Sequence, residues 1–256
     1  GYKMNPVVVR NVKIGEGIPK ICVPIVGVTR EEILAAGARI REIGADVAEW
    51  RADWYEEVFH LEKTRETAGL LRQTLGDLPL LFTFRTSKEG GEKAMETEAY
   101  VRLNQEMAES GSVDLVDAEL FTGDEEVRQI VKTAHQCGAK VIVSNHDFHK
   151  TPDKEELLKR LCKMQELGAD IPKIAVMPQN KKDVLTLLAA TEEMTSVYAD
   201  RPVITMSMAG TGVLSRLCGE VFGSALTFGA AGKASAPGQM AVEDLKTALE
   251  LLHKSL

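Results

Sequence analysis

The chain has 256 residues, 44% hydrophobic and 27% charged, which suffices for one large core and is a common length for α/β barrels. Its formal net charge of −7 argues against nucleic acid as the main partner, and no apolar run approaches the ~20 residues of a membrane-spanning helix. Four scattered cysteines without a Cys-x-x-Cys pair favour free thiols in a reducing compartment over disulfides. We therefore expect a soluble, cytoplasmic protein with one domain over residues 1–256.

In chain order, the first expected elements are two short strands, Val7–Val9 and Val12–Ile14, joined as a hairpin. Eight apolar runs follow that are hydrophobic at consecutive positions, as in parallel strands buried on both faces. They are Ile21–Val26, Val47–Trp50, Leu80–Phe84, Val113–Leu120, Val141–Ser144, Ile174–Met177, Val203–Met208 and Ala225–Phe228. Helical patterns lie between or after them, among them Arg30–Ile43, Thr97–Glu109, Asp124–Gln136, Lys154–Leu167, Lys181–Tyr198 and Val242–Lys254.

Eight strand–helix units without a linker predict a (β/α)8 TIM barrel, with the hairpin covering one end. A doubly wound open sheet is the alternative fold. The chain has no Gly-x-Gly-x-x-Gly motif opening a helix after the first strand, which weakens a dinucleotide-binding version of that alternative.

Polar residues gather where the predicted strands end, the face on which barrel enzymes place their chemistry. These positions are Glu49, Arg51, Arg85, Glu89, Asp117, Glu119, His146, Arg216 and the segment Ser235-Ala236-Pro237-Gly238-Gln239. One of these positions alone would more often be a solvated or structurally paired charge. Their shared placement favours a functional site.

Lys173 is set in an apolar strand, one strand after His146. An apolar setting lowers the pKa of a lysine, and the neutral amine can form a Schiff base with a ketone. A nearby histidine can then carry protons, since its ordinary pKa is ~6.5. The alternative to a catalytic role is that Lys173 only flanks a strand and reaches water, as Lys20 and Lys140 also open apolar runs.

At these residues the chain resembles the type I 3-dehydroquinate dehydratases, over nearly its whole length. The resemblance is carried by several segments: Glu49-Trp50-Arg51-Ala52-Asp53, Leu81-Phe82-Thr83-Phe84-Arg85, Lys88-Glu89-Gly90-Gly91, Val116-Asp117-Ala118-Glu119-Leu120, Ser144-Asn145-His146-Asp147-Phe148, Asp170-Ile171-Pro172-Lys173-Ile174, Ser215-Arg216 and Ser235-Ala236-Pro237-Gly238-Gln239. The Asn-His-Asp and Pro-Lys-Ile segments, in this order and spacing, are the most specific of them.

The resemblance implies a lyase of the shikimate pathway, and so of chorismate and aromatic amino acid biosynthesis, which dehydrates 3-dehydroquinate to 3-dehydroshikimate without metal or cofactor. It implies that Lys173 forms the Schiff base, that His146 is the general acid/base and that Glu89 assists the histidine. It also implies substrate binding by a further set of residues: Glu49, Arg51, Arg85, Arg216, Ser235 and Gln239. Among these, Arg216 would face the substrate carboxylate. The expected partner is this small molecule, together with a second copy of the chain in a homodimer.

Three rival functions stay open at this stage. A class I Schiff-base aldolase acting on a sugar phosphate would need a phosphate site, for which the segment Gly229-Ala230-Ala231-Gly232-Lys233 is the candidate. A metal-dependent hydrolase could use His146, Asp147 and His149. A barrel that only binds a small acid is the third. The small residues of Gly229–Gln239 also predict a mobile lid over bound substrate, with a rigid connection as its alternative.

Overall fold

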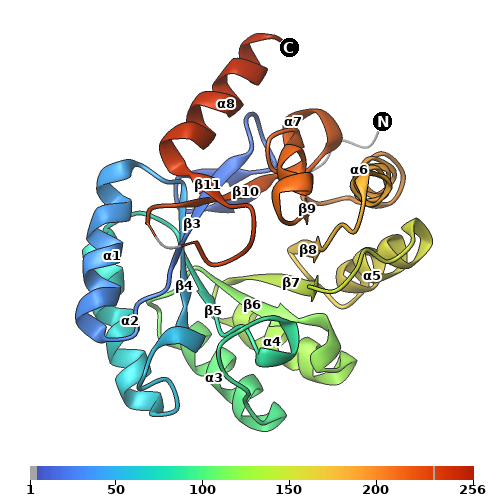
Figure 1. Ribbon diagram of the computed structural model, residues 1–256. Helices are drawn as coiled ribbons and strands as arrows, with labels where there is room; N and C mark the ends of the chain where they lie inside the picture. Colours follow the sequence, from blue (N-terminus) through green and yellow to red (C-terminus); the bar gives the residue numbers. More distant parts are fainter. Residues whose placement is uncertain (1–4, 233) are drawn as a thin grey trace.

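The computed structural model describes residues 5–232 and 234–256 of the chain. An antiparallel hairpin, β1 (Val7–Val9) and β2 (Val12–Ile14), precedes a curled parallel sheet with helices around its outside (Figure 1). The strands of the sheet are β3 (Lys20–Ile25), β4 (Val47–Arg51), β5 (Leu80–Thr83), β6 (Leu115–Glu119), β7 (Lys140–Asp147), β8 (Ile171–Val176), β9 (Ile204–Ser207), β10 (Leu226–Ala230) and β11 (Met240–Ala241). The α-helices are α1 (Arg30–Ile43), α2 (Leu61–Leu75), α3 (Thr97–Glu109), α4 (Asp124–Gln136), α5 (Lys154–Glu166), α6 (Lys181–Glu193), α7 (Gly219–Phe222) and α8 (Val242–Lys254).

The strand order confirms the TIM-barrel-like fold. Strands β3 to β9 pair in sequence order and β10 returns to pair with β3, which a doubly wound sheet would not do. The ring closes between β9 and β10 through a bridge at Val203 and Ser224. There the Ala225 N–H donates to the Val203 carbonyl at 2.9 Å, and the Ser224 hydroxyl accepts from the Thr205 N–H at 3.0 Å.

At three places in the sheet, an aspartate that directly precedes one strand forms hydrogen bonds with the backbone of the preceding strand. Asp46 precedes β4, and its carboxylate accepts from the Ile21 N–H at 2.8 Å while its own N–H donates to the Ile21 carbonyl at 2.9 Å. The same reciprocal pair forms between Asp114 and Leu80, and again between Asp170 and Val141. These contacts satisfy backbone groups that would otherwise lose their partners at the end of the ladder.

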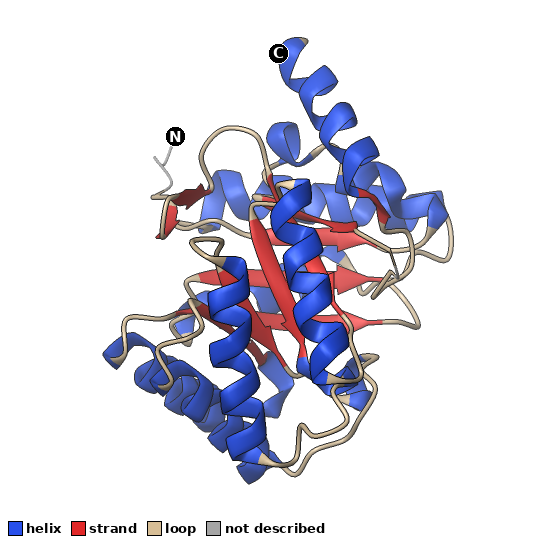
Figure 2. Cartoon of the chain, turned by 90° about the vertical axis from the view of Figure 1, so that its left-hand side faces the viewer, coloured by secondary structure: helices blue, strands red, loops and turns tan. Residues whose placement is uncertain are grey.

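The hairpin covers the end of the barrel at which the strands begin, as predicted (Figure 2). Val9 and Ile14 are buried there in one cluster with the first inward-facing side chains of the strands. Those side chains are Cys22, Val47, Leu81, Leu115, Ile142, Ile171, Ile204 and Leu226. Because side chains alternate along a strand, the residues two and four positions further on also point inward, toward the opposite end. These eight side chains form an apolar layer at the start of the strands, called the apolar floor below. The polar inward-facing side chains lie in the layers beyond it, toward the strand ends.

Three helices begin at a capping side chain. Thr29, Asp153 and Asn180 each accept a bond from a backbone N–H in the first turn of α1, α5 and α6. The predicted helix Lys181–Tyr198 is interrupted, since α6 ends at Glu193 and residues Met194–Tyr198 form a π-helical turn. After β9 the barrel has a 3-10 helix, Gly210–Arg216, and the short α7 in place of a long helix. None of the described helices is long and apolar enough to cross a membrane.

Candidate active site

Lys173 is the inward-facing residue of β8 one layer above the apolar floor. It is 4% exposed, and its Nζ lies 4.5 Å from the centre of the Phe228 ring. Burial lowers the pKa of Lys173, and Arg85 adds to that effect, while Glu49 opposes it. The amine is therefore held closer to its neutral, nucleophilic form than a lysine in water.

His146 lies on the neighbouring strand β7 and is bonded to Glu89, which ends the 3-10 helix Ser87–Glu89. Glu89 Oε1 is 3.0 Å from His146 Nδ1 and accepts from the His146 backbone N–H at 2.8 Å. Burial, and then the cations Arg85 and Lys173, lower the pKa of His146 well below its ordinary value. Burial and Glu119 raise the pKa of Glu89 to about 8. Both shifts disfavour an ion pair, and a ring that carries its proton on Nδ1, toward Glu89, has Nε2 free to act as a base.

Arg85 is held by carboxylates of β6. Its guanidinium donates to both oxygens of Asp117 at 3.0 Å and to Glu119 at 2.9 Å, all buried. Although burial alone would lower it, these two carboxylates raise the pKa of Arg85 well above its ordinary value. Ser144 completes the cluster by donating to Asp117 at 2.7 Å. Arg85 is therefore a fixed positive charge beside His146 and Lys173.

Arg51 is fixed by Asp53, which is buried in the loop after β4. Two parallel bonds of 2.8 Å join the guanidinium to the two carboxylate oxygens. Asp53 also accepts from the backbone N–H groups of Arg85 at 3.1 Å and Glu92 at 3.0 Å. Burial alone would raise the pKa of Asp53, but these donors hold it below its ordinary value. One carboxylate thus ties together the loops after β4 and β5.

The connection between β10 and β11 lies against the same cavity. Gln239 and Ser235 bond to each other, with Gln239 Nε2 donating to the Ser235 hydroxyl at 2.8 Å. The Pro237 carbonyl accepts from Arg216 Nη2 at 2.8 Å and from the Ala209 N–H at 3.2 Å. Ala209 has φ 64°, a left-handed conformation that is unusual for a residue with a Cβ.

Arg216 is 3% exposed and has no acidic partner among the described residues. Burial lowers its pKa to about 10, and its Nε is buried without a hydrogen-bond partner in that part of the chain. A buried guanidinium of this kind is suited to receive a carboxylate from a ligand, which would supply the missing charge.

The structure brings eight of the nine predicted site residues to one cavity: Glu49, Arg51, Arg85, Glu89, His146, Lys173, Ser235 and Gln239. Arg216 stands just behind its wall, 3.6 Å from the Met206 sulfur. Asp117 and Glu119, also noted at the strand ends, hold Arg85 in place.

Sequence reasoning missed Phe228 and Phe148, which also line the cavity, and the linking role of Asp53. The signal for Phe228 was its place two residues after the inward-facing Leu226. Phe148 lies with its ring nearly parallel to that of His146, at a centroid distance of 6.4 Å.

Among the described residues no group of three or more histidine, cysteine, aspartate or glutamate side chains is arranged to hold a metal ion. The carboxylate of Asp147 accepts from the backbone N–H groups of His149 and Lys150, so it serves the turn after β7. Lys233, part of the candidate phosphate segment, lies outside the described residues.

Comparison with known proteins matches residues 21–256 to the family described as type I 3-dehydroquinase. The 3-dehydroquinate dehydratase of Clostridioides difficile strain 630 is 56% identical over 248 residues, which cover 97% of each chain. That of Salmonella agona is 58% identical over 252 residues, covering 98% of this chain and all of the relative. The crystal structure of the Clostridium difficile type I enzyme with covalently modified comenic acid superposes with a TM-score of 0.96, at 56% identity and 99% coverage of both chains.

Proposed function

The chain belongs to the type I 3-dehydroquinase family, and from this premise we propose that it dehydrates 3-dehydroquinate to 3-dehydroshikimate through a Schiff base. One observation carries the proposal. A buried lysine of lowered pKa and a buried histidine of lowered pKa on the neighbouring strand line one cavity. The reaction belongs to the shikimate pathway, and the route below needs no metal or cofactor to be written.

Lys173 begins the reaction. Its neutral amine attacks the substrate ketone to give a carbinolamine, which takes up one proton from solvent and loses its hydroxyl as water, leaving an iminium linked to Nζ. The positive iminium draws electrons more strongly than the ketone does, so the neighbouring C–H becomes acidic. Phe228 excludes water from one side of Nζ and offers its π-face to the positive charge that forms.

His146 carries the proton through the elimination. Its Nε2 removes the proton next to the iminium carbon, and the electron pair moves to the nitrogen to give an enamine. The imidazolium then gives that proton to the departing β-hydroxyl, which leaves as water while the enamine electrons form the new double bond. Glu89 fixes the ring through Nδ1 so that Nε2 faces the substrate. General acid–base catalysis by a positioned side chain typically contributes ~10²–10⁴-fold to the rate. Water finally adds to the product iminium and releases Lys173.

We assign the remaining polar groups to the substrate. Arg216 pairs with the carboxylate, because it is a buried cation without an acid of its own in the described part of the chain. Ser235 and Gln239 bond to hydroxyls, while Glu49, Arg51 and Arg85 surround the reacting carbons. Because the carboxylates already hold Arg51 and Arg85 in place, these arginines do not have to reorient when the transition state forms.

We propose that the part of Gly229–Gln239 that follows β10 is a lid, since Gly229 and Ala230 themselves belong to that buried strand. The space left beside Lys173 is about 40 Å³, room for only a few water molecules. A six-membered carbon ring with a carboxylate therefore enters only if the wall moves, and Ser235, Ala236 and Gln239 are the wall residues on a connecting segment with few apolar side chains. We further propose that the chain is one barrel domain and acts as a homodimer in the cytoplasm.

Borohydride reduction during turnover of 3-dehydroquinate, followed by peptide mass mapping, tests the Schiff base. We expect the label on Lys173, and a label on Lys20 or Lys140 instead would show the assignment to be wrong. The same trapping with a sugar phosphate ketone distinguishes the class I aldolase.

The role of His146 is tested by His146→Ala. Turnover should fall by ~10²–10⁴, while borohydride still traps an imine, because Lys173 keeps its amine. Unchanged turnover would mean that another group, such as Glu89, is the base.

A further inference from the structure

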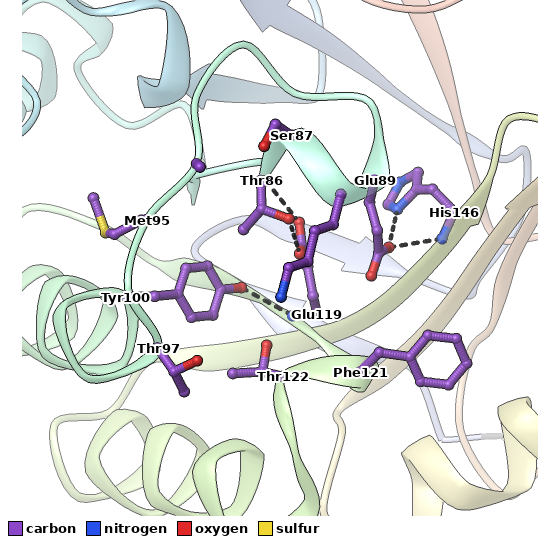
Figure 3. A pocket seen from close by; sticks show the side chains of 12 residues that line it. Thr86, Ser87, Glu89, Met95, Thr97, Tyr100, Glu119, Phe121, Thr122 and His146 are labelled. Atoms are coloured by element: carbon purple, nitrogen blue, oxygen red, sulfur yellow. Dashed lines mark hydrogen bonds and ion pairs between the residues drawn. The ribbon is translucent and has the colours of Figure 1, made fainter.

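A second cavity also reaches the Glu89–His146 pair. It has a volume of about 250 Å³ and lies between the 3-10 helix Ser87–Glu89, α3 and the 3-10 helix Leu120–Thr122 (Figure 3). Glu89 and His146 line both cavities, so the pair forms the partition between them. Nothing in the elimination step itself uses this second space.

The walls of the second cavity are rich in hydroxyl groups, from Thr86, Ser87, Thr97, Tyr100 and Thr122. A hydroxyl both donates and accepts, and a confined water needs two to four such partners. Ser87 and Thr97 are exposed, whereas Tyr100 is 2% exposed and its hydroxyl accepts from the Glu119 N–H at 2.9 Å and donates to the Asp117 carbonyl at 3.3 Å. The cavity therefore runs from the protein surface to the catalytic pair through a lining suited to water.

Glu89 presents one oxygen to each side. Oε1 takes both bonds from His146, whereas the second oxygen points into the second cavity in Figure 3 and has no protein partner among the described residues. Because Oε1 already accepts twice, a proton on a neutral Glu89 belongs on that second oxygen. An O–H directed into a hydroxyl-lined cavity is a site for water.

The proposed reaction needs a route for water. One water leaves when the imine forms and another when the β-hydroxyl departs, and one must return to hydrolyse the product imine. The substrate side has little free space and is covered by Ser235, Ala236 and Gln239, so an intermediate there blocks the direct path.

We infer that the second cavity is the water compartment of the enzyme, from which the hydrolytic water passes the Glu89–His146 partition to the imine carbon. The water oxygen becomes the keto oxygen of the product, one proton goes to His146 and the other leaves with the released amine of Lys173. This inference rests on the proposed Schiff-base function. Thr122 is one of several hydroxyl-bearing residues of the cavity wall, and its side chain points into the cavity in Figure 3.

The test is to fill the cavity with Thr122→Phe and to use Thr122→Val, of nearly unchanged shape, as the matched control. Borohydride is added during steady turnover of 3-dehydroquinate, and mass spectrometry separates the reduced product imine from the reduced substrate imine, which is heavier by one water. Thr122→Phe should lower kcat roughly tenfold, a change of ~1.4 kcal/mol in one barrier, with product imine accumulating. Thr122→Val should stay within about twofold of the parent, since one hydroxyl among several is lost.

Two results would overturn the inference: a folded Thr122→Phe enzyme with the parent's kcat, or a slow one in which substrate imine accumulates. If Thr122→Phe does not fold, Ala94→Phe at the exposed rim of the cavity makes the same test under the same criteria. Failure of the proposed function gives a different result: borohydride would trap no imine at Lys173 in the parent enzyme. That result would also refute the inference about the water compartment.

Discussion

Asp53→Asn should destabilise the protein strongly although the substitution changes only one charge. Asp53 is fully buried and accepts two bonds from Arg51 and one each from the N–H groups of Arg85 and Glu92. An asparagine of the same shape leaves the buried Arg51 charge without its counter-ion and turns an amide group toward donors. Breaking a buried pair in this way costs ~3–5 kcal/mol.

The matched control is Asp77→Asn. Asp77 also pairs with an arginine, Arg10, at 3.0 Å, but its side chain is 82% exposed, and such pairs contribute ~0–1 kcal/mol. For a chain of this size 1 kcal/mol shifts Tm by ~2–4 °C, so Asp53→Asn should lower Tm by roughly 6–20 °C and Asp77→Asn by at most about 4 °C. Melting curves followed by circular dichroism measure both.

A double-mutant cycle with Arg51→Met sharpens the test. If Asp53 acts through Arg51, the cost of Arg51→Met should be smaller by ~0.5–3 kcal/mol once Asp53 is already asparagine. Equal Tm values for Asp53→Asn and Asp77→Asn, or strictly additive costs in the cycle, would refute the reasoning.

Three further outcomes follow from the site. Lys173→Met should abolish turnover yet raise Tm, since it removes a buried amine. Because the pKa of Lys173 is lowered in the folded state, this gain in Tm should be largest at low pH and shrink as the pH approaches 10.5. Melting curves recorded across this pH range measure it. Glu89→Gln should gain stability relative to the parent as the pH rises from about 4.5 to about 8 and then level off, since a carboxyl with a raised pKa loses its stabilisation over that window; a difference in Tm that is flat with pH would contradict it. Hydrogen exchange of Ala230–Gln239 should slow when a substrate analogue binds, and equal protection in both states would rule out the lid.

Most of the fold was predictable because its signals are local. Apolar runs such as Val141–Ser144 and caps such as Asp153 act within a few residues of the chain, and the structure places a strand and a helix start there. The π-helical end of the helix after β8 and the short α7 carry no comparable period, since they adapt to packing between distant elements.

The features of the site likewise separate into those with a local sequence signal and those that depend on long-range contacts. Lys173 and His146 stand out in the sequence because each is polar in or beside an apolar strand, and the register of β7 with β8 then puts them on adjacent strands. The opposite pKa shifts of Glu89 and His146 and the second cavity were not predictable. Both depend on how the loop after β5 folds back over β7, a contact between residues 57 positions apart.

The reciprocal bonds at the strand starts reveal an internal symmetry of the barrel. Asp46 links β3 to β4, Asp114 links β5 to β6, Asp170 links β7 to β8, and Ser224 makes the corresponding contact between β9 and β10. The contacts therefore recur at every second strand boundary, and only the one between β9 and β10 is made by a neutral hydroxyl, beside a single bridge instead of a ladder. The ring should therefore open locally between β9 and β10, next to Arg216 and the proposed lid, at a lower free-energy cost than at the boundaries held by a carboxylate and a ladder.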